Sequence, residues 1–157
     1  MIKDSGERRE FSSGAVRDMA DKGRCDLLPL HTCALWLDSR LLSALAAYQS
    51  SGDPSRLLYA LNRCIHEGIF PDESTLLLEV AHQMQEGAEK YGERNWEKGI
   101  PTASYVDSAV RHYLKHRRGD TDERHDRALA WNLLCALWTA INKPELNSYN
   151  TSAEDPQ

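Results

Sequence analysis

One stretch of the sequence limits the possible folds more than any other. From Ala128 to Ile141, apolar side chains would cover nearly every side of a helix, and Asn132 is the one strongly polar residue among them. A helix that is apolar all round is buried by its neighbours. We therefore expect a helical segment over residues 122–141 to lie at the centre of the fold.

Earlier parts of the chain show the spacing of amphipathic helices. Apolar residues recur at intervals of three and four positions. Asp53 and Pro54 combine an N-cap with proline at the first helical position, and Gly52, Gly68 and Gly92 are typical of helix ends. Because strand patterns are weak throughout, we predict an all-α fold. These earlier helical segments cover residues 39–51, 53–67, 72–91 and 104–116.

The organisation of the chain follows from its length and its polar ends. A chain of 157 residues favours one domain. We predict a polar N-terminal arm over residues 1–22, a single helical domain over residues 23–142 and a flexible tail over residues 143–157. Both ends are expected to fray, because they carry few apolar groups to bury.

Composition excludes several classes of function. The formal net charge of -5 argues against a broad surface for duplex nucleic acid, which normally carries a basic face. The four cysteines form no C-x-x-C pair, which weakens zinc-ribbon and thioredoxin interpretations. No apolar stretch approaches the length needed to span a bilayer, and the polar N-terminus lacks the apolar core of a signal peptide. A reducing cytoplasm fits this chain better than secretion.

Two carboxylate pairs have the spacing of a metal site. Glu86 and Glu89 form E-x-x-E on one predicted helix, and Glu123 and Asp126 form E-x-x-D at the start of another. Residues three apart share a helix face, and carboxylate oxygens are the ligands that Mg²⁺ and Mn²⁺ prefer. Asp107, on the helix between them, is a further candidate. The alternative is that these carboxylates are ordinary surface charges.

A polar and aromatic loop over residues 94–99 is a candidate binding site for a phosphate-bearing ligand. Basic side chains hold phosphates, amides read base edges and tryptophan stacks on bases. The alternative is a structural loop whose tryptophan fills the core, and we expect Trp36, Trp131 and Trp138 to be core residues. The candidate ligand-binding residues are Lys90, Arg94, Asn95, Trp96, Lys98, Arg111, His112 and Asn132.

Histidines allow two further interpretations. His112 and His116 are four residues apart, a spacing that can bind zinc, although the simpler view is an exposed helix face. His125-Asp126 is the dipeptide of HD-type phosphohydrolases, which also need an upstream histidine and a later aspartate. The one later aspartate is Asp155, in the predicted tail.

These motifs together resemble a known phage and bacterial family, dATP/dGTP diphosphohydrolase, N-terminal. The segments that carry the resemblance are Tyr91 to Gly99, Asp107 to His112 and Ala130 to Asn132, joined by Gly14 to Asp18 and Gly23 to Pro29. Residues 37–75 look like an insertion or a subfamily feature, read as an inserted helical hairpin.

The resemblance implies a MazG-like helical bundle that hydrolyses purine (deoxy)nucleoside triphosphates to a monophosphate and pyrophosphate. It further implies a bound Mg²⁺ or Mn²⁺, catalytic roles for Glu86, Asp107 and Glu123, and a site completed by homo-oligomerisation in the cytoplasm of a phage-infected or lysogenic host. The metal ligands would be Glu86, Glu89, Asp107, Glu123 and Asp126. The alternative function is a non-catalytic nucleotide sponge that sequesters a cyclic or ADP-ribose-type signalling nucleotide.

Overall fold

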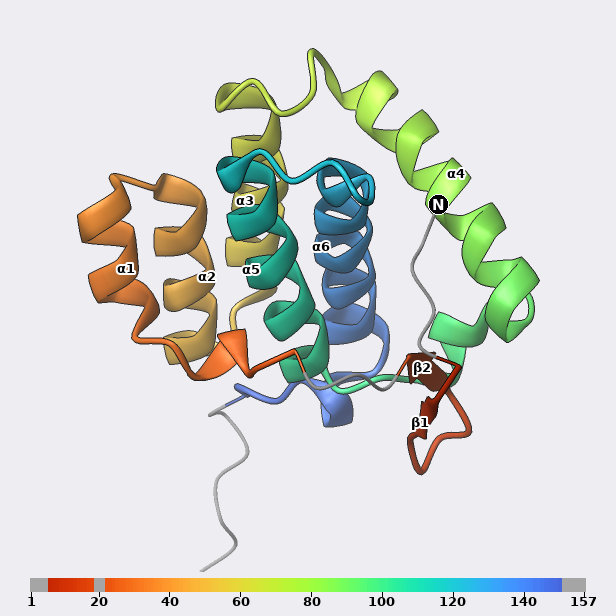
Figure 1. The fold of residues 1–157 in the computed structure, drawn as a ribbon. Helices are drawn as coiled ribbons and strands as arrows, with labels where there is room; N and C mark the ends of the chain where they lie inside the picture. Colours follow the sequence, from red (N-terminus) through yellow and green to blue (C-terminus); the bar gives the residue numbers. More distant parts are fainter. Residues whose placement is uncertain (1–5, 19–21, 151–157) are drawn as a thin grey trace, which may run out of the picture.

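The computed structural model describes residues 6–18 and 22–150 and has the all-α architecture expected from the sequence (Figure 1). Its single sheet, within the described part, is one short antiparallel hairpin. No helix of this part has the length and hydropathy needed to cross a membrane. The elements are β1 (Arg8–Glu10), β2 (Val16–Asp18), η1 (Cys25–Leu27), α1 (Leu30–Leu37), α2 (Arg40–Ser51), α3 (Pro54–His66), α4 (Glu73–Tyr91), η2 (Asn95–Lys98), α5 (Thr102–Arg118), α6 (His125–Asn142) and η3 (Pro144–Leu146).

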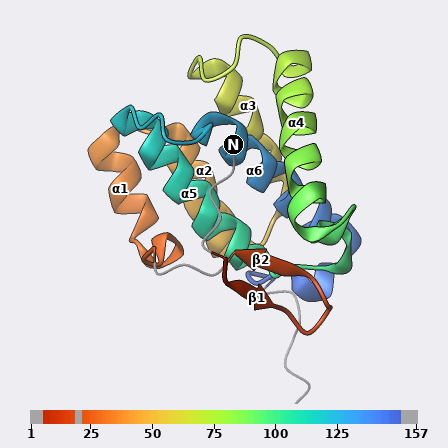
Figure 2. The same ribbon diagram turned by 45° about the vertical axis from the view of Figure 1, so that its right-hand side comes forward.

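The central position predicted for the last long helix is confirmed. α6 packs against α3, α4 and α5, and Leu129, Leu133 and Ala136 are almost completely buried along it. In Figures 1 and 2, α6 lies between α5 and α4, and α4 forms the outer side of the bundle next to α6.

Helix starts follow the capping chemistry in the sequence. The Asp53 carboxylate accepts the backbone N–H of Ser55 ahead of α3, with Pro54 at the first helical position, and Asp72 accepts the N–H of Thr75 ahead of α4. These bonds satisfy backbone donors that a helix leaves without partners. The helix boundaries predicted there agree closely with the structure.

Sequence periodicity did not predict helix α1 or the hairpin of β1 and β2. α1 has no side-chain cap and leaves Leu35 and Trp36 exposed, at 84% and 87%, so its apolar residues do not form one buried face. The expectation that Trp36 is a core residue is therefore wrong. The hairpin strands of the predicted arm are three residues long and contain a single apolar residue, Val16, so they show no alternation from which a strand could be recognised.

The predicted tail is held against the bundle as far as the structure describes it, through Asn150. The Asn147 amide accepts from the Tyr48 hydroxyl at 2.6 Å and donates to the Gly52 carbonyl at 2.8 Å. Tyr149 packs edge-on against the Tyr48 ring, 5.4 Å away. These contacts replace the fraying expected for this part of the tail, whereas residues 151–157 lie outside the described residues.

The tail contact gives a stability prediction at the end of α2. Gly52 has a φ of 66°, and a Cβ placed there would collide with the backbone of Tyr149 and Asn150. Gly68 has a similar φ of 74° with open space around it. Replacement of either glycine by alanine should lower the free energy of unfolding by about 1–2 kcal/mol, because alanine is strained in the left-handed conformation. Gly52→Ala should lose roughly a further 1–3 kcal/mol of unfolding free energy, because the tail must move. Chemical denaturation of both variants checks this, and equal losses would contradict the packing described.

Candidate functional site

A cavity of about 430 Å³ lies between the hairpin, α4, η2, α5 and the start of α6. Its walls combine three kinds of side chain: aromatic rings from Tyr91, Trp96 and Trp131, two carboxylates from Asp107 and Glu123, and a larger group of basic residues. For a chain with a net charge of -5, this is a marked local concentration of positive charge. The basic residues are Arg9, Arg17, Lys22, Arg24, Arg94, Arg111 and Lys115.

The structure places most of the candidate ligand-binding residues at this one cavity and leaves the others elsewhere. Glu86, Glu89, Lys90, Lys98 and Asp126 are not among the residues that line it. The candidates that line it are Arg94, Asn95, Trp96, Asp107, Arg111, His112, Glu123 and Asn132.

The carboxylates of the two predicted pairs are not gathered into one cluster among the described residues. Glu86 lies 3.6 Å from the Arg127 guanidinium, and Asp126 is bound by Arg124 at 2.9 Å. Ion pairing with arginine supplies the positive charge that a metal would otherwise supply. The metal roles of Glu86, Glu89 and Asp126 stay predictions.

Asp107 lines the cavity and is hydrogen-bonded to neighbouring protein groups. Its Oδ1 accepts the backbone N–H of Cys25 at 2.6 Å, and both carboxylate oxygens lie 2.7 Å from Arg111 Nη2. Arg111 donates in addition to the Gly23 carbonyl at 2.7 Å. The Asp107–Arg111 pair therefore fixes residues 23–25 against α5, and this gives both side chains a positioning role.

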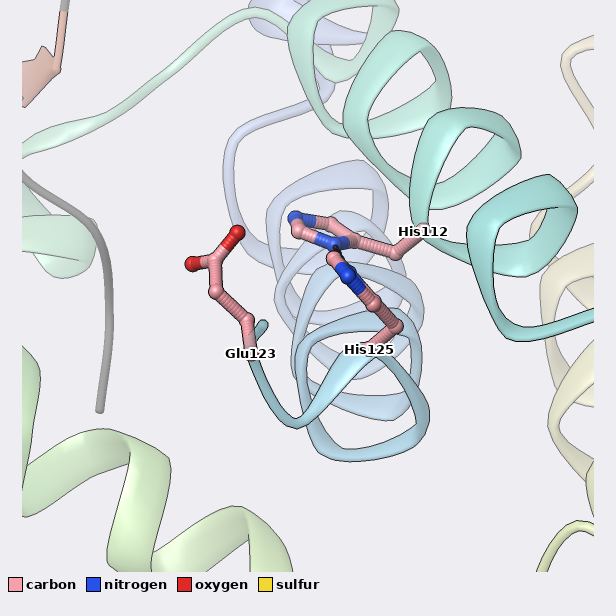
Figure 3. Close-up of side chains that lie close together, drawn as sticks. All are labelled: His112, Glu123 and His125. Carbon is pink, nitrogen blue, oxygen red and sulfur yellow. Dashed lines mark hydrogen bonds between the residues drawn. The ribbon is translucent and has the colours of Figure 1, made fainter. Parts of the chain in front are cut away.

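A hydrogen-bonded chain of two histidines and an aspartate runs from the α5–α6 turn toward the cavity. His125 Nε2 lies 2.7 Å from Asp122 Oδ1, and the Nδ1 atoms of His125 and His112 are 2.9 Å apart. The carboxylate accepts, so a neutral His125 donates through Nε2 and accepts at Nδ1 from His112. His112 Nε2 then has a free lone pair. Figure 3 shows this nitrogen on the side of the Glu123 carboxylate.

His112 is neutral at neutral pH. Burial is the largest cause that lowers the pKa of His112, followed by the charge of His125, and together with nearby basic groups they bring it to about 3. A neutral imidazole is the form that ligates metals. His116, in contrast, is exposed and belongs to no candidate metal cluster of the described residues, so the zinc pair suggested by its spacing is not assembled there.

One group of side chains that could hold a divalent cation is His112, Glu123 and His125, whose donor atoms lie within 4.8 Å of one another. Because both nitrogens of His125 are already hydrogen-bonded, the donors of this group would be His112 Nε2 and the Glu123 carboxylate. A second group, Asp120, Asp122 and His125, shares the buried His125. Mixed imidazole and carboxylate donors suit Mn²⁺ and other transition metals, whereas Mg²⁺ favours oxygen ligands. The bond between His112 and His125 matches the way a ligating histidine is oriented by a partner on its other nitrogen.

The two asparagines among the candidates are committed to protein contacts. The Asn95 side chain accepts the Val16 N–H at 2.9 Å and donates to the Val16 carbonyl at 2.7 Å. It thereby bonds the β2 backbone as a neighbouring strand would. Asn132 donates to the Ala128 carbonyl and accepts from Arg17, both bonds that satisfy a buried amide.

Several basic residues at this cavity were not candidates from the sequence, namely Arg9, Lys22, Arg24, Lys115 and Arg17. Arg17 makes the most extensive contacts of these. Its Nη2 donates to Ser108 Oγ and Asn132 Oδ1, each at 3.1 Å, and its guanidinium lies over the rings of Tyr105 and Trp131. Arg17 is half-buried and lines the cavity. Desolvation lowers the pKa of Arg17. The polar pattern of residues 8–18 gave no reason to place it beside α6.

Fold and site together define an all-α protein with a basic, aromatic-lined cavity next to a His–Glu cluster. A sequence model of the family described as dATP/dGTP diphosphohydrolase, N-terminal, matches residues 69–149, and the chain belongs to this family. The match covers α4, α5 and α6 and begins after most of the segment that we interpreted as an insertion. No curated protein and no solved structure matches the chain.

Proposed function

We propose that the protein hydrolyses purine (deoxy)nucleoside triphosphates to the monophosphate and pyrophosphate in this cavity, with the help of a divalent metal. The observation that carries the proposal is the basic lining of a cavity in an otherwise acidic chain. Family membership supports the substrate class, because the family is described by hydrolysis of dATP and dGTP. Homo-oligomerisation and a location in the host cytoplasm belong to the same proposal and depend on the family resemblance alone.

Different parts of the cavity would bind different parts of the nucleotide. An arginine guanidinium can bond two oxygens of one phosphate, so the basic side chains that line the cavity would hold the polyphosphate. The partly buried rings of Trp96 and Trp131 offer apolar faces of the kind on which a purine stacks. Trp96 is itself supported by Trp138, whose ring centroid lies 4.9 Å away, so it is oriented before a ligand binds.

His112 and Glu123 are the residues that would hold the metal, with His125 and Asp122 fixing the orientation of His112. A divalent ion bound there supplies charge stabilisation at phosphorus and lowers the pKa of a bound water. Because one of the two ligands is an imidazole, we propose Mn²⁺ as the more effective ion and Mg²⁺ as the weaker one.

Incubation of the purified protein with a nucleotide panel tests this proposal. The panel contains dGTP, dATP, GTP, ATP and cyclic dinucleotides, each with Mn²⁺, with Mg²⁺ or with a chelator, and chromatography resolves the products. We expect monophosphate plus pyrophosphate from a purine triphosphate, faster with Mn²⁺ and absent with chelator. Release of orthophosphate instead would contradict the proposed bond cleavage.

The same experiment separates hydrolysis from sequestration. If no nucleotide turned over and one were recovered intact from heat-denatured protein, the cavity would be a nucleotide-binding sponge. The arginine pairing of Glu86 and Asp126 is compatible with that outcome, since those carboxylates are already neutralised without a metal.

A further inference from the structure

Two arginines of the hairpin are placed directly opposite each other. Arg9 on β1 pairs with Arg17 on β2 in the antiparallel register, and both line the cavity. Both also reach Ser104 on α5: Arg9 Nη2 donates to its hydroxyl at 2.5 Å and Arg17 Nη1 to its carbonyl at 3.4 Å. Like charges directly opposite in a strand pair repel, so this arrangement is unfavourable unless something balances it.

Protein groups do not balance the charge of Arg17 within the described residues. Its hydrogen-bond acceptors are a hydroxyl, an amide and a carbonyl, and its stacking partners are neutral rings. No carboxylate of residues 6–17 and 22–150 forms an ion pair with it, whereas Arg24, Arg94 and Arg111 at the same cavity each have one.

A guanidinium taken out of water without a counter-charge is costly, and neutral dipoles compensate for only part of that cost. Arg17 is half-buried and lines the cavity together with Arg9, and both guanidinium groups are held near Ser104. An anion at that point would receive bonds from two guanidinium groups and remove their mutual repulsion. The planar donor fork of arginine matches the oxygens of a phosphate.

We propose that Arg9 and Arg17 together bind a phosphate group of the ligand, and that the hairpin is the element that carries this phosphate seat into the cavity. The proposal deepens the proposed function, because it assigns the polyphosphate to the hairpin end of the cavity. It assigns both arginines as positioning residues, which hold the phosphate chain while the reacting phosphorus lies nearer Glu123 and His112.

Metal-free binding of inorganic pyrophosphate, followed by calorimetry and by thermal shift, tests the seat without depending on turnover. We expect Arg17→Met to weaken pyrophosphate binding at least about tenfold, the loss typical of a charge-assisted bond. Without ligand, its midpoint of thermal unfolding should stay close to that of the wild type, because removal of an unpaired charge offsets the loss of the bonds from Arg17 to Ser108 and Asn132. Arg8→Met is the matched control: it removes an exposed arginine of the same hairpin that does not line the cavity.

A second variant keeps the test decisive if Arg17→Met fails to fold. Arg9→Met lies at an exposed position, and we expect it to fold normally and to weaken pyrophosphate binding severalfold. Wild-type affinity in either variant would overturn the proposed seat, even if dGTP were still hydrolysed. Absence of dGTP turnover with an intact, arginine-dependent pyrophosphate site would instead contradict the proposed reaction and leave the seat standing.

Discussion

Replacement of Glu123 by glutamine should abolish most of the turnover of the preferred purine triphosphate. The glutamine amide keeps the size of the side chain but loses the charge with which Glu123, beside His112, would hold a metal. We expect a decrease in kcat on the order of 100-fold or more, in line with the loss of a metal-ligating group. Metal-free affinity for dGTP should be equal or higher, because one negative charge leaves a cavity that binds an anion.

Glu93→Gln provides the matched control, since Glu93 is an exposed carboxylate outside the cavity lining. The two variants differ in position but not in the change of charge. Steady-state kinetics across a Mn²⁺ titration, with nucleotide affinity measured separately in chelator, distinguishes a lost metal from a lost substrate. A Glu123→Gln enzyme with kcat within about threefold of the wild type would exclude the metal role proposed for this residue.

Asn95→Ala should weaken the attachment of the hairpin to the bundle and thereby lower the affinity for phosphate. The alanine removes both bonds to the Val16 backbone and leaves a half-buried N–H and C=O without this partner. Loss of such bonds corresponds to roughly 1–3 kcal/mol. Because Arg9 and Arg17 depend on the position of the hairpin, we expect pyrophosphate binding to fall at least about tenfold. Hydrogen exchange of residues 8–18 should rise together with this loss.

This experiment distinguishes the structural role of Asn95 from the base-reading role expected from the sequence. Pyrophosphate has no base, so a variant that bound it normally but changed its choice between dATP and dGTP would support base reading. Asn62→Ala, at an exposed position on α3, controls for the loss of an amide side chain.

Local chemistry made much of the fold predictable. Asp53-Pro54 and Asp72 start helices through contacts within three residues. Residues 128–141 are apolar on nearly every side of the helix, which identifies the central helix without knowledge of its neighbours. α1 was not predicted because Leu35 and Trp36 are apolar but exposed, so the sequence pattern does not show which side of the helix is buried. Its position depends on packing against α2, which periodicity cannot express.

The site was predictable where a residue type has one strong chemical use. Trp96, Arg111, His112 and Glu123 were selected for their chemistry, and all four line the cavity. The exact partners were not predictable, because they come from distant parts of the chain. Arg17 donates a hydrogen bond to Asn132, which lies 115 positions further along the chain. The local sequence around Arg17 contains no pattern that predicts such a contact.

The same hairpin has a consequence for the order in which the molecule forms. The pairs α1–α2, α2–α3 and α5–α6 bury apolar surface between helices that are neighbours in sequence, and α3 packs on α6 across the length of α4 and α5. The contacts of β2 with η2 and α6 close loops of 79 and 115 residues. Long closures carry an entropic cost before their contacts form, and so tend to come late in folding. Because the contact between Arg17 and Asn132 closes the longer of these loops, we expect the hairpin to dock late, so that the wall of the cavity formed by β2 is among the last parts of the molecule to form.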